Sequence, residues 1–298
     1  MKEGINMNNL DMDQHVIKWF KSQFDENNNI KNITYYIGRY TDKIYLFKEK
    51  NKCERMQNIL KIIRQDLAKI STTLDRMEWL LKESNKKNEN FAYLNGLSIF
   101  DPDRKLDFQT IDIEYFLVKY RSVIDYSIDF LLEFFPEISK QKKYQIEKKT
   151  EYLKNIFSEF EIMQKNIFYS DWHSQVRLIR NSIIHAGTTC YTFAPEKDED
   201  PNQILFQIYD SNLDERIFES DSFKYNENIY DFKKTCALYM AYLYFYLDTL
   251  FKSIICKNEK ISFKTLENKL IQIYNEHKDN LFLNSTYSLV LKSWIDQC

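Results

Sequence analysis

Residues 110–135 read TIDIEYFLVKYRSVIDYSIDFLLEFF, and Pro136 follows them directly. The stretch contains no glycine or proline, and its apolar side chains recur at spacings of three and four residues. Such spacing is that of a helix. Proline disfavours helical backbone at the residue before it, so the helix should end there. We therefore expect a long buried helix, and we take it as the centre of a mainly α fold.

A second apolar series, with steps of four and three, precedes this helix. It consists of Met56, Leu60, Ile63, Leu67, Ile70, Leu74, Met77 and Leu81. The pattern is that of a coiled-coil seam. It fits either a surface that binds a partner helix or an inner face packed within the bundle. Further helices are expected at 11–24, 33–47, 140–169, 228–255 and 262–278, with a last helical piece after residue 284.

One region departs from the helical pattern. Residues 188–194 and 203–209 are rich in β-branched and aromatic residues, and an acidic turn at 195–202 separates them. This arrangement predicts a β-hairpin; residues 216–219 are a further candidate strand. The expected fold is thus an antiparallel helical bundle with a small β-hairpin insertion at about 188–219 and added N-terminal helices. We expect an N-terminal helical region at 1–107 and a helical domain at 108–298.

Composition excludes several classes of protein. The chain has 298 residues and a net charge of -2, so it is not a globally basic nucleic-acid binder. A local basic patch is still enough to hold a few phosphates. The five cysteines are scattered without a C-x-x-C pair, which favours reduced thiols in a cytoplasmic protein over a disulfide framework or a zinc site. The most apolar stretch, 236–256, contains Asp248 and Lys252, so we expect no membrane segment.

The segment 174–187, SQVRLIRNSIIHAG, combines residue types that suit catalysis. We expect a short helix here, because Ser174 is favoured at an N-cap and Gly187 just beyond a helix end. Arg177, Asn181 and His185 are spaced by four residues and therefore share one face. The long side chain of Arg180 can lean towards this face. Two guanidinium groups, an amide and an imidazole would then meet near the helix end.

These groups suit the cleavage of a phosphodiester. An imidazole exchanges protons near neutral pH, and a guanidinium binds phosphate and stabilises the charge of the transition state. The amide can orient the imidazole or bind the ribose. RNA supplies its own nucleophile, the 2′-hydroxyl, so such a site needs neither a metal ion nor another cofactor. One imidazole is only a base or an acid, and a second one from a symmetry mate would complete the site.

The hexapeptide RNSIIH at 180–185 resembles the R-x4-H motif of the HEPN superfamily, in its common R-N-x-x-x-H form. Residues 120–132 (YRSVIDYSIDFLL) resemble the earlier core helix of that superfamily, including an Arg-x-x-x-Asp pattern at Arg121 and Asp125. The resemblance covers about residues 108–256. It implies a HEPN-type helical bundle, a homodimer, and metal-independent RNA cleavage that leaves a 2′,3′-cyclic phosphate and a 5′-hydroxyl.

By position, the resemblance makes Arg180 and His185 catalytic and gives Asn181 a supporting role. HEPN proteins often serve as toxins or in antiviral defence, so it also implies an RNA substrate and an antitoxin or defence protein as partner. Some HEPN toxins have a tyrosine two residues after the histidine, where a nucleotidyltransferase modifies it. Gly187 occupies that position here, which counts against such a pairing. Other members only bind RNA, nucleotide or protein, and this is the alternative function.

Four further residues are candidates for holding the substrate, and each has a structural alternative. They are Arg177, His173, Lys142 and Lys143. A surface ion pair fits the arginine, a loop or capping role fits the histidine, and a solvated helix start fits the lysines. Arg121 and Asp125 are expected to form a structural ion pair. The tyrosines within 239–246 are expected to pack in the core rather than stack on bases.

Overall fold

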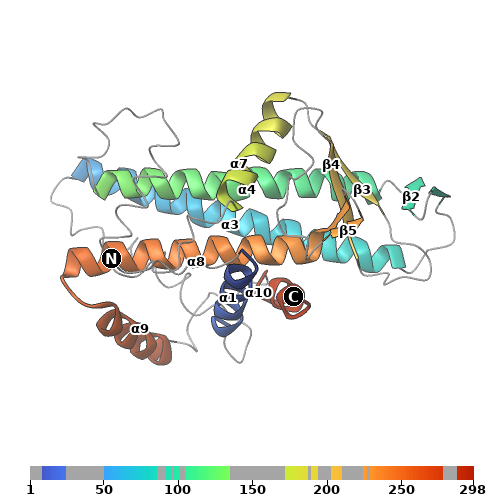
Figure 1. Ribbon diagram of the computed structural model, residues 1–298. Coiled ribbons are helices and arrows are strands. Elements are labelled where there is room, and N and C mark those ends of the chain that lie inside the picture. The colour runs from blue at the N-terminus through green and yellow to red at the C-terminus, as the bar shows by residue number, and fades with distance from the viewer. Residues whose placement is uncertain are drawn as a thin grey trace, which may run out of the picture.

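The structure, a computed structural model, describes residues 9–24, 50–85, 92–94, 97–100, 105–134, 172–186, 189–193, 203–209, 224–226, 229–277 and 287–298. Helices dominate these residues, which confirms the predicted mainly α class (Figure 1). They are α1 (Asn9–Ser22), α3 (Lys50–Asn85), α4 (Lys105–Phe134), α7 (Trp172–Asn181), α8 (Phe232–Glu259), α9 (Phe263–His277) and α10 (Tyr287–Asp296). The helices predicted at 33–47 and 140–169, the acidic turn and the strand at 216–219 lie outside the described residues.

The three long helices α3, α4 and α8 lie side by side and form the body of the bundle (Figure 1). Arg55, near the start of α3, pairs with Glu133, near the end of α4, at 2.9 Å, while Arg76 pairs with Asp112 near the start of α4. These two helices are therefore antiparallel. α4 and α8 run in the same direction, which the long connection between them permits because it carries α7 and a small sheet.

The inner face of α3 is part of this core. All eight residues of the predicted seam are between 0% and 5% exposed. The seam therefore packs within the bundle, and its interpretation as a partner-binding surface is wrong. The same apolar cluster takes in residues of α1, α4, α8 and α10, on both sides of position 107. The boundary between a 1–107 region and a 108–298 domain stays a prediction.

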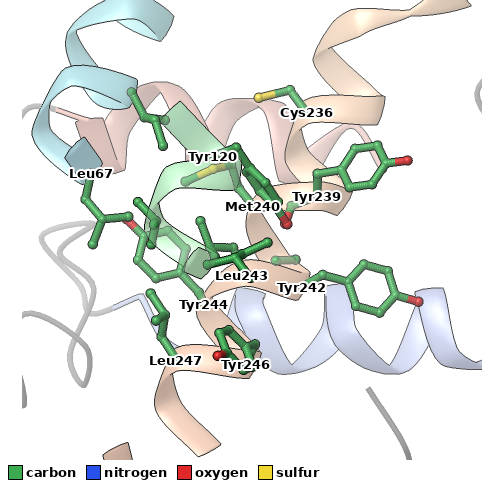
Figure 2. Close-up of a cluster of buried hydrophobic side chains, with 14 of the residues drawn as sticks. Leu67, Tyr120, Cys236, Tyr239, Met240, Tyr242, Leu243, Tyr244, Tyr246 and Leu247 are labelled. Carbon is green, nitrogen blue, oxygen red and sulfur yellow. The ribbon is translucent and has the colours of Figure 1, made fainter. Parts of the chain in front are cut away.

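The core continues around α8, which is buried on nearly all sides. Its tyrosines are in the core, as predicted, and their hydroxyl groups find internal partners. Tyr246 and Ser127 hydroxyls lie 2.7 Å apart, and Tyr242 donates to Asp13 on α1 at 2.6 Å. Figure 2 shows these tyrosines around α8, with Leu67 and Tyr120 from the two neighbouring helices. Hydrogen bonds of this kind offset the cost of burying the hydroxyl groups of Tyr242 and Tyr246.

The β-hairpin prediction is confirmed but incomplete. β3 (Thr189–Phe193) pairs antiparallel with β4 (Leu205–Tyr209). β6 (Ile229–Asp231) and β5 (Lys224–Asn226) extend the sheet to four strands in the order β3-β4-β6-β5. Both added strands are only three residues long, too short for a clear alternating pattern.

A second hairpin, β1 (Ala92–Leu94) with β2 (Leu97–Phe100), precedes α4. The sequence analysis did not predict this hairpin, and α4 begins at Lys105, five residues before the start of the helix predicted at 110–135.

The four-stranded sheet lies against α4. The backbone N–H of Cys190 donates to Glu114 Oε1 at 3.2 Å, and Thr192 Oγ1 donates to the Leu106 carbonyl at 2.6 Å. β3 is the end strand of this sheet. The Glu114 carboxylate thus accepts a backbone N–H at the edge of β3, and both bonds fix the chain to α4 shortly after the 180–185 motif.

Candidate functional site

α7 is the short helix that carries the motif, and it crosses over α4 (Figure 1). It begins at Trp172, so Ser174 lies in its first turn and is not the N-cap that we predicted. Val176 and Ile179 are fully buried and form the inner stripe of the helix. Tyr239 of α8 donates its hydroxyl proton to Gln175 Oε1 at 2.8 Å. Apolar contact and one hydrogen bond therefore hold α7 on the bundle.

The end of this helix departs from α-helical geometry. α7 runs into η2 (Ser182–Ala186), a single π-helical turn. Arg180 and His185 are five residues apart, so on a regular α-helix they would point about 140° apart. A π-turn closes on the fifth residue and takes in more residues, which brings the two side chains closer to one face. Nothing in the sequence signalled this turn, although π-turns are frequent at functional sites.

A buried arginine of α4 lies beneath α7. The Arg121 side chain is only 5% exposed, and its Nη2 lies 2.7 Å from Asp125 Oδ1. Burial lowers the pKa of Arg121, the Asp125 charge opposes this, and the positive charges of Arg177 and Arg180 lower the pKa further. The guanidinium groups of Arg177 and Arg180 are therefore each close enough to Arg121 to repel its charge. We call Arg121, Arg177 and Arg180 the arginine cluster.

The arginine cluster carries more positive than negative charge. Asp125 is the acid that pairs with Arg121, while Arg180 Nη1 donates to the neutral Asn181 Oδ1 at 3.0 Å. Within the described part of the chain, Arg177 and Arg180 form no ion pair, so the surface ion pair considered for Arg177 is not found there. Guanidinium groups held in this way attract an anion, and phosphate fits their paired N–H groups.

His185 lies at the free end of this arrangement. Its side chain is exposed, and among the described residues no hydrogen-bond partner orients its imidazole. Two apolar side chains near it, Leu178 and Ile184, are also exposed. Asn181 is half-buried and bonded to Arg180. The structure thus places Arg177, Arg180, Asn181 and His185 along one short stretch of helix beside Arg121.

The remaining predicted substrate-binding residues are His173, Lys142 and Lys143. His173 lies in the first turn of α7, while Lys142 and Lys143 lie outside the described residues. The ion pair of Arg121 with Asp125 is confirmed. The place of Arg121 under α7 was missed, because it depends on how two helices cross. The Arg-x-x-x-Asp pattern on α4 was the signal that could have found it.

Three observations bear on other kinds of site. Among the described residues there is no group of three or more His, Cys, Asp or Glu side chains placed to hold a metal ion. Cys190, Cys236, Cys256 and Cys298 form no disulfide. In the same part of the chain, no helix combines the length and apolar character needed to cross a bilayer.

Comparison of the chain with protein-family models, with curated proteins and with solved structures gave no match.

Proposed function

We propose that this chain is a HEPN-like, metal-independent endoribonuclease that acts as a homodimer in the cytoplasm. The arginine cluster beside the Arg180–His185 motif is the observation that carries the proposal. Among the described residues Arg177 and Arg180 have no acidic partner and the imidazole of His185 is exposed, so a guanidinium is available for phosphate and an imidazole for proton transfer. The resemblance of RNSIIH to the HEPN motif adds the reaction type and a role as a toxin or defence effector.

In the proposed reaction, the arginine cluster binds the scissile phosphate and stabilises the charge of the pentacoordinate transition state. His185 of one protomer takes the proton of the ribose 2′-hydroxyl. The 2′-oxygen attacks phosphorus and the P–O5′ bond breaks, which leaves a 2′,3′-cyclic phosphate. The departing 5′-oxygen takes a proton from the second imidazole and becomes a 5′-hydroxyl. Asn181 holds Arg180 in place through their hydrogen bond.

The dimer follows from the need for that second imidazole. The exposed Leu178 and Ile184 lie on the same short helical stretch as His185. Contact between two copies through this stretch would bury both apolar side chains and bring the two His185 residues together. An isologous contact of this kind places the same groups on each side of a two-fold axis. An antitoxin or another defence protein could then act by separating the copies.

The first experiment is cleavage of an end-labelled, mixed-sequence RNA in EDTA. Wild type, His185→Ala and Arg180→Ala are compared, with His277→Ala, at the last residue of α9, as the histidine control. We expect wild type and the control to cut and to leave cyclic phosphate ends, and the other two variants not to cut. Cleavage by His185→Ala at the wild-type rate would show that the site is assigned wrongly.

A second candidate function is a non-catalytic module that binds RNA, nucleotide or a protein partner. It is favoured by the exposure of His185 and by the lack of an orienting partner among the described residues. The same experiment separates the two functions. Retention of RNA by the arginine cluster without any cleavage, lost in Arg180→Ala, would identify the binding module.

A further inference from the structure

Exposed large apolar side chains gather on one part of the bundle. Four of them lie on α3 and α4, namely Trp79 at 59% exposed, Phe108 at 51%, Ile111 at 55% and Tyr115 at 37%. Three of the four are aromatic. An exposed patch of this kind on a folded protein commonly marks a binding surface.

The pairing of the two helices places these aromatic residues on either side of one ion pair. Arg76 of α3 pairs with Asp112 of α4. Trp79 is one turn after Arg76 and Phe108 one turn before Asp112, so in antiparallel helices both lie to the same side of the pair. Tyr115, one turn after Asp112, lies to the other side. Ion pair and aromatic residues therefore alternate along the two helices.

Several cations of this region form ion pairs with buried carboxylates. Asp66 is buried and binds both Lys69, at 3.2 Å, and Lys119, at 3.1 Å. The Lys119 ammonium also lies 5.8 Å from the centre of the Tyr115 ring. A hydrogen bond from Lys69 to Asp66 and the charge of that acid raise the pKa of Lys69, which keeps it protonated. Lys69 and Arg76 are anchored in this way while their side chains remain largely exposed.

The exposed surface of α3 carries no acidic side chain over seven turns. From Arg55 to Lys82, each exposed position holds a cation or a neutral residue: Arg55, Asn58, Lys61, Arg64, Gln65, Ala68, Lys69, Thr72, Arg76, Trp79 and Lys82. The acids of this stretch are buried or half-buried. Four of these six cations form ion pairs, Arg55 with Glu133, Lys69 with Asp66, Arg76 with Asp112 and Lys82 with Glu78, while Lys61 and Arg64 form none among the described residues.

We infer that the outer face of α3 and α4, built from Lys61, Lys69, Arg76, Trp79, Phe108 and Tyr115, binds single-stranded RNA. We call it the α3–α4 face. Cations bind the phosphates of a single strand, and exposed aromatic rings stack on its unpaired bases. From Lys69 to Trp79 the alternation spans roughly 15 Å of helix. This is enough for more than one nucleotide.

The charge pattern favours RNA over a second copy of the chain. A two-fold contact through the α3–α4 face would set its lysines and arginines against their own symmetry mates. The inference rests on the proposed function for its choice of RNA, and it names a surface, away from the arginine cluster, that would hold the substrate strand.

Binding is measured by fluorescence anisotropy with a labelled, unstructured RNA oligonucleotide in EDTA. His185→Ala serves as the parent protein, so the RNA is not cut. Trp79→Ala and Phe108→Ala should each weaken binding about tenfold, the range of one lost base stack. Lys61→Gln should lower the slope of log K against log salt by roughly 0.7, because one phosphate contact is lost. Arg76 is left unchanged because Asp112 beneath it is fully buried.

Two control variants come from α9. Ile271 is 59% exposed, the same fraction as Trp79, and Lys264 is an exposed cation. Ile271→Ala and Lys264→Gln should bind the RNA as the parent does. The matching duplex RNA should bind more weakly than the single strand, because its bases are not free to stack on the aromatic rings.

Binding by Trp79→Ala and Phe108→Ala that equals the parent would overturn the inference. So would the absence of RNA binding together with self-association that Trp79→Ala abolishes in sedimentation velocity, which would make the face a protein interface. A different result would contradict the proposed function alone. If wild type does not cleave RNA but the parent binds it through Trp79, the function is wrong and the α3–α4 face stands.

Discussion

The helical stretch formed by α7 and η2 differs from helix α8 in how much of its surface is buried. α8 is buried on nearly every side, and its tyrosine hydroxyls reach partners within the bundle. α7 is fully buried only along Val176 and Ile179, and among the described residues its arginines form no ion pair. We therefore expect α8 to determine stability, and α7 with η2 to determine activity. Substitutions in α8 should change stability, and polar substitutions in α7 and η2 should change activity.

The largest expected effect is on cleavage by His185→Ala. Loss of a general base or acid lowers a rate by about 10²–10⁴-fold. Since the side chain is exposed, the free energy of unfolding should change by less than about 0.5 kcal/mol. RNA cleavage rates and urea unfolding of the same preparations test both parts. A large fall in the stability of His185→Ala would contradict the prediction that polar residues of α7 and η2 affect activity and not stability.

The next effect belongs to α8. Phe251 is fully buried and packs against Phe130, with ring centroids 5.7 Å apart. Phe251→Ala should lower the free energy of unfolding by about 3–5 kcal/mol, because it leaves a cavity. Phe251→Leu, which keeps most of the volume, should cost far less. Cleavage per folded molecule should stay unchanged in both, and a loss of activity in the folded protein would contradict this.

Local spacing explains what the sequence predicted correctly in the fold. The steps of three and four in residues 56–81 and 110–135 depend only on near neighbours, and both became buried helix faces. The same spacing could not distinguish a seam facing a partner from one facing the bundle. β5 and β6 were missed because three residues contain too little alternation, and β6 leads directly into α8.

The site was predicted only as far as one helix reaches. Arg177, Asn181 and His185 were placed together by their spacing along α7 and η2. The nearness of Arg121 depends on the crossing of α4 and α7, which are separated by residues 135–171. The π-turn at Ser182–Ala186 changes the spacing of the helix, and no residue type in this segment signals it. Tertiary contacts such as the helix crossing leave no periodic trace in the sequence.

A buried acid on α8 predicts an unusual dependence on pH. Asp248 is buried with its Oδ1 unbonded, and burial raises its pKa even though Lys252 opposes this at 2.8 Å. The folded state then holds this proton to a higher pH than the unfolded state does. Stability from this group is therefore full below its ordinary pKa of 3.8 and is lost as pH rises through the raised value. Asp248→Asn should remove this decline.

The measurement is urea unfolding from pH 3.5 to 7. Glu78→Gln is the comparison, because the stability due to Glu78 should change with pH in the opposite direction. Glu78 is half-buried, and burial, the largest single effect, raises its pKa, but the hydrogen bond and charge of Lys233, the hydrogen bond from Trp294 and the charge of Lys82 together lower it. Stability from Glu78 should thus be present above its ordinary pKa of 4.5 and fall as pH falls. Equal pH slopes for wild type and Asp248→Asn would contradict the assignment.

The smallest expected effect lies where the two regions meet. The Tyr239 hydroxyl of α8 donates to Gln175 of α7. Tyr239→Phe keeps the ring and removes this bond, so stability should fall by about 0.5–1.5 kcal/mol. Cleavage should fall only a few-fold, because Val176 and Ile179 still dock the helix. A loss of activity as large as that of His185→Ala would mean that the hydrogen bond, not the apolar stripe, positions the site.

The carboxylate of Glu114 has a consequence for how copies of this chain meet. By accepting the N–H of Cys190, it occupies part of the edge at which an extended segment of another molecule would join β3. Unprotected edges recruit strands and lead to open-ended polymers. With Glu114 bound at this point of the edge, a strand of another molecule cannot pair with the Cys190 N–H, and strand addition at β3 is disfavoured there.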